Sequence, residues 1–222
     1  MSSFSPLMPD VVRAAFADAL AFVLPVSCAG CGAADVALCP ACAVLLARPS
    51  DLVRSVGDGL VVHSAFRYVD EPARMLRALK EDGRTALARP FGRALAMRAA
   101  SAFPGEDLVF VPVPTSRASM RRRGYRVVEL LTRRSGLPAL AALRPARRTA
   151  DQRTLGREER ASNVRGSLVA TPAASGRRVV VVDDVVTTGA TLEEAMRALT
   201  AAGADVRGAL TVAATPKRRF DA

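Results

Sequence analysis

The chain has 222 residues, half of them hydrophobic, and a formal net charge of +11. This length supports one well-packed core and a smaller appended module, which excludes a small scaffold that depends on disulfide bonds. No apolar run approaches the roughly 20 residues of a membrane-spanning helix, and the absence of tryptophan disfavours a stacking surface for single-stranded nucleic acid.

The positive charge is concentrated in one part of the chain. Between Arg117 and Arg165 there are 14 arginines against four acidic residues. Such a patch suits a polyanionic partner or a strongly anionic substrate, although an arginine-rich composition can also be a habit of a whole genome.

The N-terminal segment predicts a helix and not an export signal. Apolar residues recur at helical spacing over residues 10–24, with Asp10 as a candidate N-cap and Pro25 as a stop. Charged residues interrupt this segment and no basic stretch precedes it, so we expect no signal peptide. We therefore predict a cytoplasmic protein.

All the cysteines follow, as two C-x-x-C pairs: Cys28, Cys31, Cys39 and Cys42. Four thiolates at this spacing, with no cysteine left over, are typical of a closed tetrahedral zinc site with a structural role. The alternatives are a redox pair or two disulfides. A reducing cytoplasm disfavours disulfides, and a redox centre does not require a second pair, so we predict a zinc knuckle.

The next segment predicts one strand and two helices. Residues 60–68 are typical of a strand, a helix begins near Asp70, and a second helix covers residues 87–102. Lys80 and Arg84, near the end of the first helix, are either solvated charges or ligands of an anion. We expect them to be solvated.

A second apolar strand is predicted over residues 107–113, followed by the basic sequence SRASMRRRGY and a helix. Because open α/β sheets bind ligands where strands end, the arginines of this basic loop are candidates for a pyrophosphate site. The alternative is a solvated basic turn. Residues 137–143 predict a further strand, and residues 144–165 a long polar loop or hairpin.

The segment VVVVDDVVTTGAT, residues 179–191, carries the most specific pattern in the chain. Its β-branched run predicts a strand, over residues 178–183, that is buried on both faces. Asp183 and Asp184 emerge at its carboxyl end, where they can accept hydrogen bonds from a vicinal diol and hold Mg²⁺ through its waters.

The small residues after the acid pair predict an anion-binding turn. Backbone N–H groups of this turn, and the dipole of a helix over residues 191–202, favour a phosphate group. No lysine follows the glycine at the Walker spacing, so a nucleoside triphosphate is not expected. An ordinary turn capped by Thr191, or a receiver-like acidic pocket, are the alternatives. Gly203 is the expected C-cap, and residues 204–213 predict a last strand.

Strand, acid pair, turn and helix together resemble the 5-phosphoribosyl-1-diphosphate (PRPP) motif of type I phosphoribosyltransferases. The whole chain resembles the ComF family of competence-associated proteins, which includes ComFC. That resemblance rests on the cysteine pairs, LK-x-x-GR from Leu79, VPVP with RRRGY, the pattern R-T-x-x-Q-x-x-L over residues 148–155 with its continuation to Gly166, and VVDDVVTTGAT. One departure is that Arg126 and Val127 stand where the family usually has Asn-Gln.

The resemblance implies a role for each motif. Asp183 and Asp184 would hold the ribose and metal-bound water, with structural zinc on the cysteines and Mg²⁺ as the second metal. The 5-phosphate would lie on Thr187, Thr188, Gly189, Ala190 and Thr191. The pyrophosphate, partly under a mobile loop, would meet Arg117, Arg121, Arg122, Arg123, Arg148 and Arg160. The implied reaction displaces pyrophosphate from PRPP with an unidentified nucleophilic acceptor.

The predicted fold class is α/β, with a doubly wound, mostly parallel sheet of the type I phosphoribosyltransferase kind, an N-terminal zinc knuckle and a helical hood. The predicted division is residues 1–48 for the N-terminal helix and knuckle, 49–103 for the hood, and 104–222 for the phosphoribosyltransferase-like domain. A second hypothesis is a non-catalytic protein of DNA uptake that binds single-stranded DNA through the arginine-rich patch and contacts the competence machinery.

Overall fold

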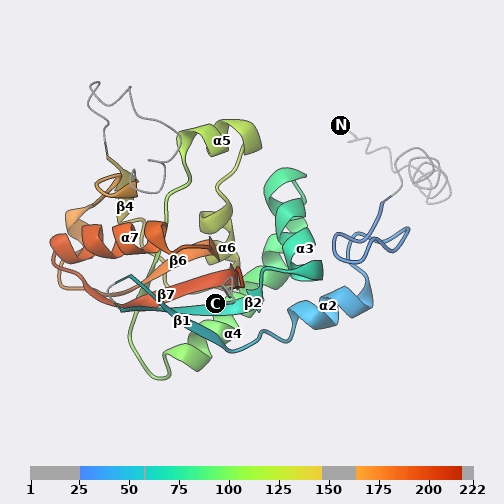
Figure 1. Ribbon diagram of the computed structural model, residues 1–222, viewed down its shortest axis with the longest axis horizontal. Helices are drawn as coiled ribbons and strands as arrows, with labels where there is room; N and C mark the ends of the chain where they lie inside the picture. Colours follow the sequence, from blue (N-terminus) through green and yellow to red (C-terminus); the bar gives the residue numbers. More distant parts are fainter. Residues whose placement is uncertain (1–25, 58, 147–163, 217–222) are drawn as a thin grey trace, which may run out of the picture.

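The computed structural model describes residues 26–57, 59–146 and 164–216 (Figure 1). The helix predicted over residues 10–24 lies outside these ranges, as do Arg148, Arg160 and most of the long polar loop. Within the described ranges, none of the helices has the length and hydrophobicity needed to cross a membrane.

The core is a five-stranded sheet with the order β1-β2-β7-β6-β3. Strand β1 is antiparallel to β2, and every other neighbouring pair is parallel. The predicted mostly parallel sheet is therefore confirmed. Its strands are β1 (Leu52–Val56), β2 (Leu60–Arg67), β3 (Val109–Pro112), β6 (Arg178–Val186) and β7 (Asp205–Ala214).

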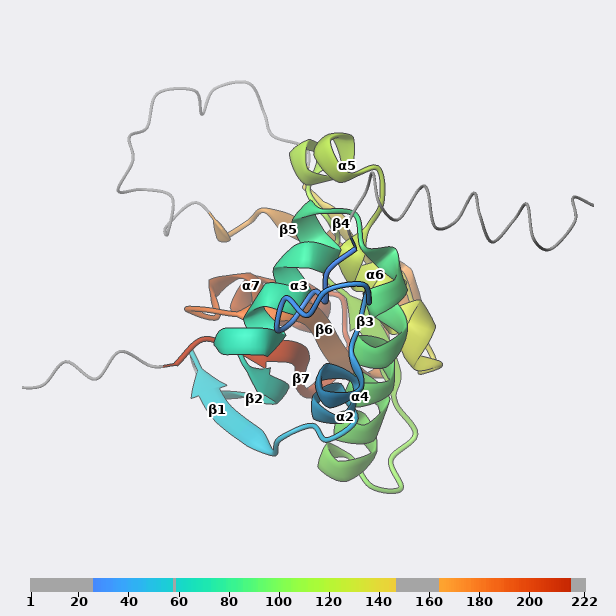
Figure 2. The same cartoon turned by 90° about the vertical axis from the view of Figure 1, so that its right-hand side faces the viewer.

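Helices cover both faces of this sheet, as expected of a doubly wound fold (Figure 1). One face packs against α3 (Asp70–Glu81), α4 (Ala88–Ala102) and α6 (Val127–Ser135), and the other packs against α7 (Ala190–Ala201). The short helix α2 (Pro40–Leu46) contacts α4, and α5 (Arg117–Arg123) stands away from the sheet in both views (Figure 2).

The apolar run of β6 explains this two-faced architecture. Val180 and Val182 pack with α4 and α6, whereas Val179 and Val181 pack with α7, and all four are buried. Because side chains of a strand alternate between the two faces of the sheet, a strand covered by helices on both sides must be apolar throughout. The continuous valines therefore place β6 in the middle of the fold.

The prediction that residues 137–143 form a strand of the main sheet is wrong. Ala139 makes only an isolated parallel bridge to Phe110, and the chain then enters a separate two-stranded sheet of β4 (Leu143–Pro145) and β5 (Leu168–Ala170). These two strands are antiparallel, so they bring the two ends of the long polar segment side by side. Prolines at 138 and 145 limit how much of this stretch can join a ladder, since proline has no N–H donor.

Two further elements differ from the sequence-based expectation. The basic stretch after β3 forms the helix α5 and not a loop, because the Ser116 side chain accepts a hydrogen bond from the Ser119 N–H (3.2 Å) and Gly124 ends the helix at φ 76°. Strand β1, for which the sequence predicted no element, extends the sheet beyond β2. The helix α7 ends one residue earlier than expected, with Ala202 as C-cap and Gly203 after it at φ 81°.

The predicted division at residues 48/49 and 103/104 stays a prediction. Strands β1 and β2 belong to the same sheet as the strands after residue 104, because β2 pairs with β7. Short 3₁₀ helices, Thr85–Leu87 and Pro172–Ala174, complete the described elements.

Candidate phosphoribosyl and metal sites

The acid pair lies within β6 and not after it, because β6 continues to Val186. Strand β3 ends at Pro112, whose register partner is Val182, so the strand from Asp183 onward has a neighbour only on the β7 side. The carboxyl edge of the sheet is therefore open beside Asp183 and Asp184. Both side chains are partly exposed there, at the edge where parallel sheets bind their ligands.

The two carboxyl groups have different surroundings. Asp183 Oδ1 accepts a hydrogen bond from the Asp184 N–H (2.8 Å). Burial and then the neighbouring charge of Asp184 raise the pKa of Asp183 to about 8, against the opposing effects of the Asp184 N–H and of Lys80. An acidic group whose ionisation is held back in this way gains charge when a cation arrives, which suits a divalent metal.

Asp184 points to the face of the sheet that carries α3, where it meets Lys80. The Lys80 Nζ lies 2.9 Å from Asp184 Oδ2, and the two side chains are only 19% and 14% exposed. Lys80 is therefore a constituent of this site, and the expectation that it is a solvated helix-end charge is wrong. Arg84 is also engaged, because its Nη1 donates to the Ser27 carbonyl (2.6 Å).

The turn between β6 and α7 leaves backbone N–H groups at the start of a helix, where an anion is favoured. Thr187 and Thr188 are exposed, and Gly189 is the N-cap of α7 at φ 99°, with no side-chain hydrogen bond to the cap. The Thr188 Oγ1 accepts from the Ala190 N–H at 3.4 Å, while the other amides at the start of α7 keep the orientation that favours a phosphate. The alternative in which Thr191 caps this helix is wrong.

Strand β1 supports this turn from below. A Cβ atom at Gly189 would lie 2.6 Å from the Val56 Cβ, so the turn sits directly on β1. Arg54, also on β1, donates from Nη2 to the Thr187 carbonyl (2.6 Å) and from Nη1 to the Thr215 carbonyl (3.2 Å). It therefore ties the turn after β6 to the end of β7, beside a cavity of about 330 Å³ lined by β1, β2 and residues 214–216.

The arginines predicted to bind pyrophosphate lie on a helix separate from the acid pair and the turn after β6. Arg117, Arg121, Arg122 and Arg123 all belong to α5, where Arg121 and Arg122 are exposed. No hydrogen bond or ion pair between described residues links α5 to the acid pair or to the turn after β6. The structure brings together Asp183, Asp184 and the Thr187–Thr191 turn, and it leaves the role of the basic segment as a prediction.

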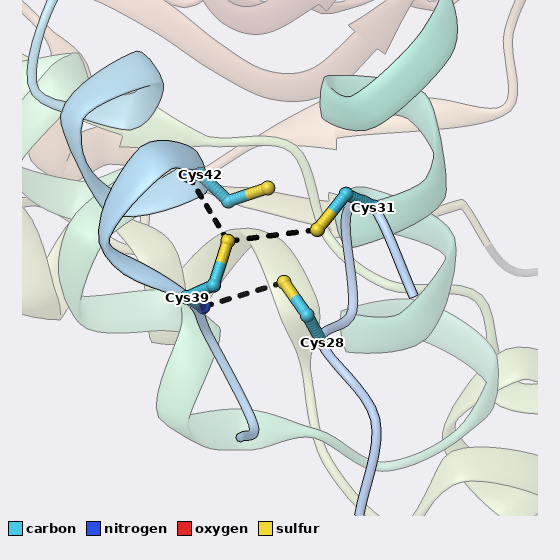
Figure 3. A group of neighbouring side chains, drawn as sticks. All are labelled: Cys28, Cys31, Cys39 and Cys42. Carbon is cyan, nitrogen blue, oxygen red and sulfur yellow. Dashed lines mark hydrogen bonds between the residues drawn. The ribbon is translucent and has the colours of Figure 1, made fainter. Parts of the chain in front are cut away.

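The four cysteines converge on one point, with Cys28 and Cys31 coming from a turn and Cys39 and Cys42 from the start of α2 (Figure 3). Their sulfur atoms all lie within 4.8 Å of one another, Cys28, Cys39 and Cys42 are buried, and all four are free thiols. Tetrahedral zinc with sulfur at about 2.3 Å needs such a cluster of four. The donor set and its spacing therefore fit zinc.

Hydrogen bonds within the cluster shift the pKa values of its thiols in opposite directions. Burial opposes ionisation of Cys28, but N–H groups of Cys39, Cys31 and Gly30 outweigh it and lower the pKa of Cys28 to about 6. Burial, hydrogen bonding of the Cys42 thiol to the other sulfur atoms and the charge of Cys28 raise the pKa of Cys42 to about 12. Backbone donors aimed at sulfur favour a thiolate, the form that binds a metal.

A doubly wound sheet with an acid pair and a strand-to-helix turn at its carboxyl edge is an arrangement that suits a phosphorylated ligand. The family model described as "Phosphoribosyl transferase domain" matches residues 93–222, more than half of the chain. The chain belongs to this family. A comparison with curated proteins found no match.

The solved structures similar to the chain include several that are named as phosphoribosyltransferases or after PRPP. They include the glutamine PRPP amidotransferase of B. subtilis (26% identity, 55% of this chain and 25% of that chain, TM-score 0.37) and the adenine phosphoribosyltransferase of Saccharomyces cerevisiae (14%, 78% and 87%, 0.40). A hypoxanthine-guanine phosphoribosyltransferase of Bacillus anthracis has 16% identity over 61% of this chain and 73% of that chain, with a TM-score of 0.41. The chain spans between a quarter and a third of the first three structures that it matches.

Arg54 was not among the predicted site residues, and Lys80 was considered only as an alternative ligand of an anion. Arg54 had no signal, because it sits in a polar stretch far from the acid pair in sequence. Lys80 had one, since it is one of only two lysines in a chain with 30 arginines. A lysine kept in an arginine-rich chain suggests a place where the compact ammonium group is needed.

Proposed function

We propose that the protein binds PRPP with Mg²⁺ at the carboxyl edge of β6 and transfers the phosphoribosyl group to a nucleophilic acceptor with release of pyrophosphate. The observation that carries this proposal is the open edge of β6, which joins the acid pair to the turn at the start of α7 within a chain of the phosphoribosyl transferase domain family. This arrangement matches a ligand with a diol at one position and a phosphate at the next.

Each part of the site then has a distinct task. Asp183 and Asp184 would accept hydrogen bonds from the ribose hydroxyls and would hold the waters of Mg²⁺, which would supply positive charge against the pyrophosphate group. Thr187–Thr191 bind the 5-phosphate and so fix the sugar against the sheet. Catalysis rests mainly on positioning and electrostatics, because positive charge develops on the ribose as pyrophosphate leaves. Arg117, Arg121–Arg123, Arg148 and Arg160 are proposed to meet the pyrophosphate.

The cysteine cluster is proposed to hold one structural zinc ion through Cys28, Cys31, Cys39 and Cys42. Its support is the convergence of four sulfur atoms within 4.8 Å and the thiolate-favouring hydrogen bonds. Zinc held by four thiolates has no open coordination position, so it stabilises the fold and takes no part in transfer. Free thiols in such a site also suit the predicted cytoplasmic location.

Calorimetric titration with PRPP tests the first proposal. In excess Mg²⁺ the wild-type protein should bind PRPP, and without a divalent cation the affinity should fall sharply. Asp183→Asn with Asp184→Asn should abolish binding. The matched control is Glu106→Gln with Asp205→Asn, which removes two carboxylates from the opposite edge of the sheet, where they pair with Arg178. Equal affinity of the acid-pair variant and the control would exclude the proposed site.

A second candidate function, suggested by the ComF resemblance, is binding of single-stranded DNA in competence, either with or in place of transfer. The observation that favours it is the exposure of Arg121 and Arg122 on α5, which stands away from the sheet (Figure 1). DNA affinity should then fall steeply with salt, because each neutralised phosphate releases counterions.

Replacing Arg121, Arg122 and Arg123 with alanine should reduce the salt dependence of DNA affinity. If the same arginines serve pyrophosphate, saturating PRPP and Mg²⁺ should also weaken DNA binding. A triple variant with the wild-type salt slope would remove α5 from the DNA hypothesis.

A further inference from the structure

The contact between Lys80 and Asp184 joins the proposed ligand site to a part of the chain that the family model does not match. The match begins at residue 93, whereas Lys80 lies on α3, which covers Asp70–Glu81. Its ammonium is 2.9 Å from Asp184 Oδ2, and both side chains are largely buried. A partly buried ion pair of this kind is sensitive to anything that changes the charge of its surroundings.

The choice of lysine at this place is informative. The chain uses arginine 30 times and lysine twice, and Lys80 is the only lysine within the described ranges. An ammonium is a compact point charge that can turn between partners, whereas a guanidinium binds a carboxylate through a planar fork. Lys80 can therefore leave Asp184 for a ligand oxygen with a small movement of its side chain.

The position of α3 is in turn held by the segment that carries the cysteines. Arg74 Nε, on α3, donates to the Gly30 carbonyl, and Arg84 Nη1, just after α3, donates to the Ser27 carbonyl. Met75 packs against the same turn, because a Cβ at Gly30 would lie 3.3 Å from Met75 Cγ and 2.6 Å from Cys42 Sγ. Two hydrogen bonds and one buried contact thus fix α3 to the cysteine cluster.

A further contact fixes the end of α3 that carries Lys80. The Tyr125 hydroxyl, from the segment between α5 and α6, donates to the Leu79 carbonyl. The residue before Lys80 is therefore held from the phosphoribosyltransferase side, while Arg74 within the helix and Arg84 just after it are held from the cysteine side. This arrangement places the Lys80 ammonium beside the acid pair, although Lys80 lies outside the residues that the family model matches.

We propose that Lys80 is a ligand-binding residue of the phosphoribosyl site, which neutralises Asp184 in the free protein and supplies a cation to the phosphate or pyrophosphate oxygens of the bound ligand. This inference rests on the proposed function and extends it to α3. Two adjacent carboxylates repel an anionic ligand, and an ammonium beside them reduces that repulsion. The same ammonium competes with a divalent cation for Asp184.

Removing the ammonium should therefore change two affinities in opposite directions. In Lys80→Met, Mn²⁺ alone should bind more tightly because Asp184 is no longer paired. PRPP in the presence of Mg²⁺ should bind roughly tenfold more weakly or worse, the loss expected for one charged hydrogen bond to the ligand. A purely structural role of Lys80 would weaken both affinities together.

The experiment compares wild type, Lys80→Met, Lys80→Arg and Arg77→Met by calorimetry with Mn²⁺ alone and with PRPP plus Mg²⁺. Lys80→Arg keeps the charge and should keep most of the PRPP affinity. Arg77→Met removes an exposed charge one turn earlier on α3, without an ion pair among the described residues, and should leave both affinities unchanged. Thermal unfolding of each variant verifies the fold, and Lys80→Gln replaces Lys80→Met if the latter does not fold.

The outcomes separate this inference from the proposed function. Opposite shifts in Lys80→Met support the inference. Unchanged affinities in Lys80→Met, or equal loss of both, overturn the inference alone while wild type still binds PRPP. A wild-type protein that does not bind PRPP overturns the proposed function and this extension with it.

Discussion

The two sides of the acid pair are built in different ways. On one side, β6, the turn and α7 form a single uninterrupted segment, residues 178–201, in which every site residue is a near neighbour in sequence. On the other side, Arg54 arrives from β1 and Lys80 from α3, both far away in sequence.

The comparison shows which part of the site is formed by residues close in sequence and which part requires distant segments to pack together. The contiguous side takes its shape from alternation along a strand and from a glycine with positive φ, both of which are local. The assembled side exists only if β1 and the cysteine segment fold against it. Damage to the assembled side should therefore spread to the contiguous side, and the following predictions test this, from the largest expected effect to the smallest.

Loss of one zinc ligand should have the largest effect. Cys42→Ser should reduce the zinc content from about one ion per chain to near zero and destabilise the fold by several kcal/mol, because structural zinc contributes directly to folding. PRPP affinity should also fall, since α3 loses its anchor. Elemental analysis, thermal unfolding and calorimetry measure these three effects.

The control for that variant is Ala41→Ser, which adds a hydroxyl at an exposed neighbouring position and leaves the thiols intact. If Cys42→Ser loses zinc but keeps wild-type PRPP affinity, the cysteine cluster and the ligand site are independent.

A side chain at Gly189 should be next in magnitude. Gly189→Ala places a Cβ 2.6 Å from the Val56 Cβ at φ 99°, so about 1–3 kcal/mol of backbone strain adds to about 1–3 kcal/mol of overpacking. Gly176→Ala is the matched control, because Gly176 has φ 67° and no atom within 4 Å of the added Cβ.

Urea unfolding and phosphate titration of the two variants separate strain from contact with β1. Gly189→Ala should lose more stability than Gly176→Ala and should be the only one to lose phosphate affinity. Equal behaviour would show that β1 does not support the turn.

Arg54→Met tests the same support with a smaller change. Losing the two hydrogen bonds to the Thr187 and Thr215 carbonyls should weaken PRPP binding roughly tenfold, since each such bond from a charged donor contributes about 1.5–3 kcal/mol and part of this is recovered by water. Arg67→Met, which removes an exposed charge beside the same cavity, should have little effect. A loss of the same size in both variants would indicate general electrostatics in place of support for the turn.

The smallest expected effect, counted per pH unit, concerns the free energy of unfolding. The folded pKa of Asp183 is raised to about 8 from an ordinary value of 3.8, so the folded chain holds more protons than the unfolded chain between these values. Without Mg²⁺ the free energy of unfolding should therefore decrease as pH rises from about 4 to 8, by at most about 1.4 kcal/mol per pH unit from this group.

Asp183→Asn should remove that part of the slope, as measured by urea unfolding of the zinc-loaded protein without added Mg²⁺ between pH 5 and 8. Asp205→Asn, at the opposite end of β7, should retain it. A wild-type slope in Asp183→Asn would place the responsible group elsewhere.

Much of the fold could be predicted from the sequence, because several segments carry strong local signals. The strands near residues 60–68, 107–113, 178–183 and 204–213 and the helices α3, α4, α6 and α7 follow from apolar periodicity and punctuation. The failures have physical reasons. Strand β1 has only five residues and lies at an edge, and Ser116 turns a basic stretch into the helix α5.

For the candidate site, the sequence by itself determined the chemistry of the parts. It identified the four cysteines, the adjacent carboxylates Asp183 and Asp184, and the small residues of the Thr187–Thr191 turn, because these functions need particular atoms at short spacings. Spacing along the chain is a good guide to geometry only when the residues share one strand, turn or helix.

Only the tertiary structure decided which distant groups complete the site. Lys80 reaches Asp184 because α3 packs on the sheet and on the turn of Gly30, and Arg54 reaches Thr187 because β1 pairs with β2 at the edge of the sheet. Such contacts depend on how several elements pack at once, so the spacing of residues along the chain does not predict them. The turn after β6 can be predicted from the sequence. Its support from β1 and its neighbouring cation depend on how the whole chain folds.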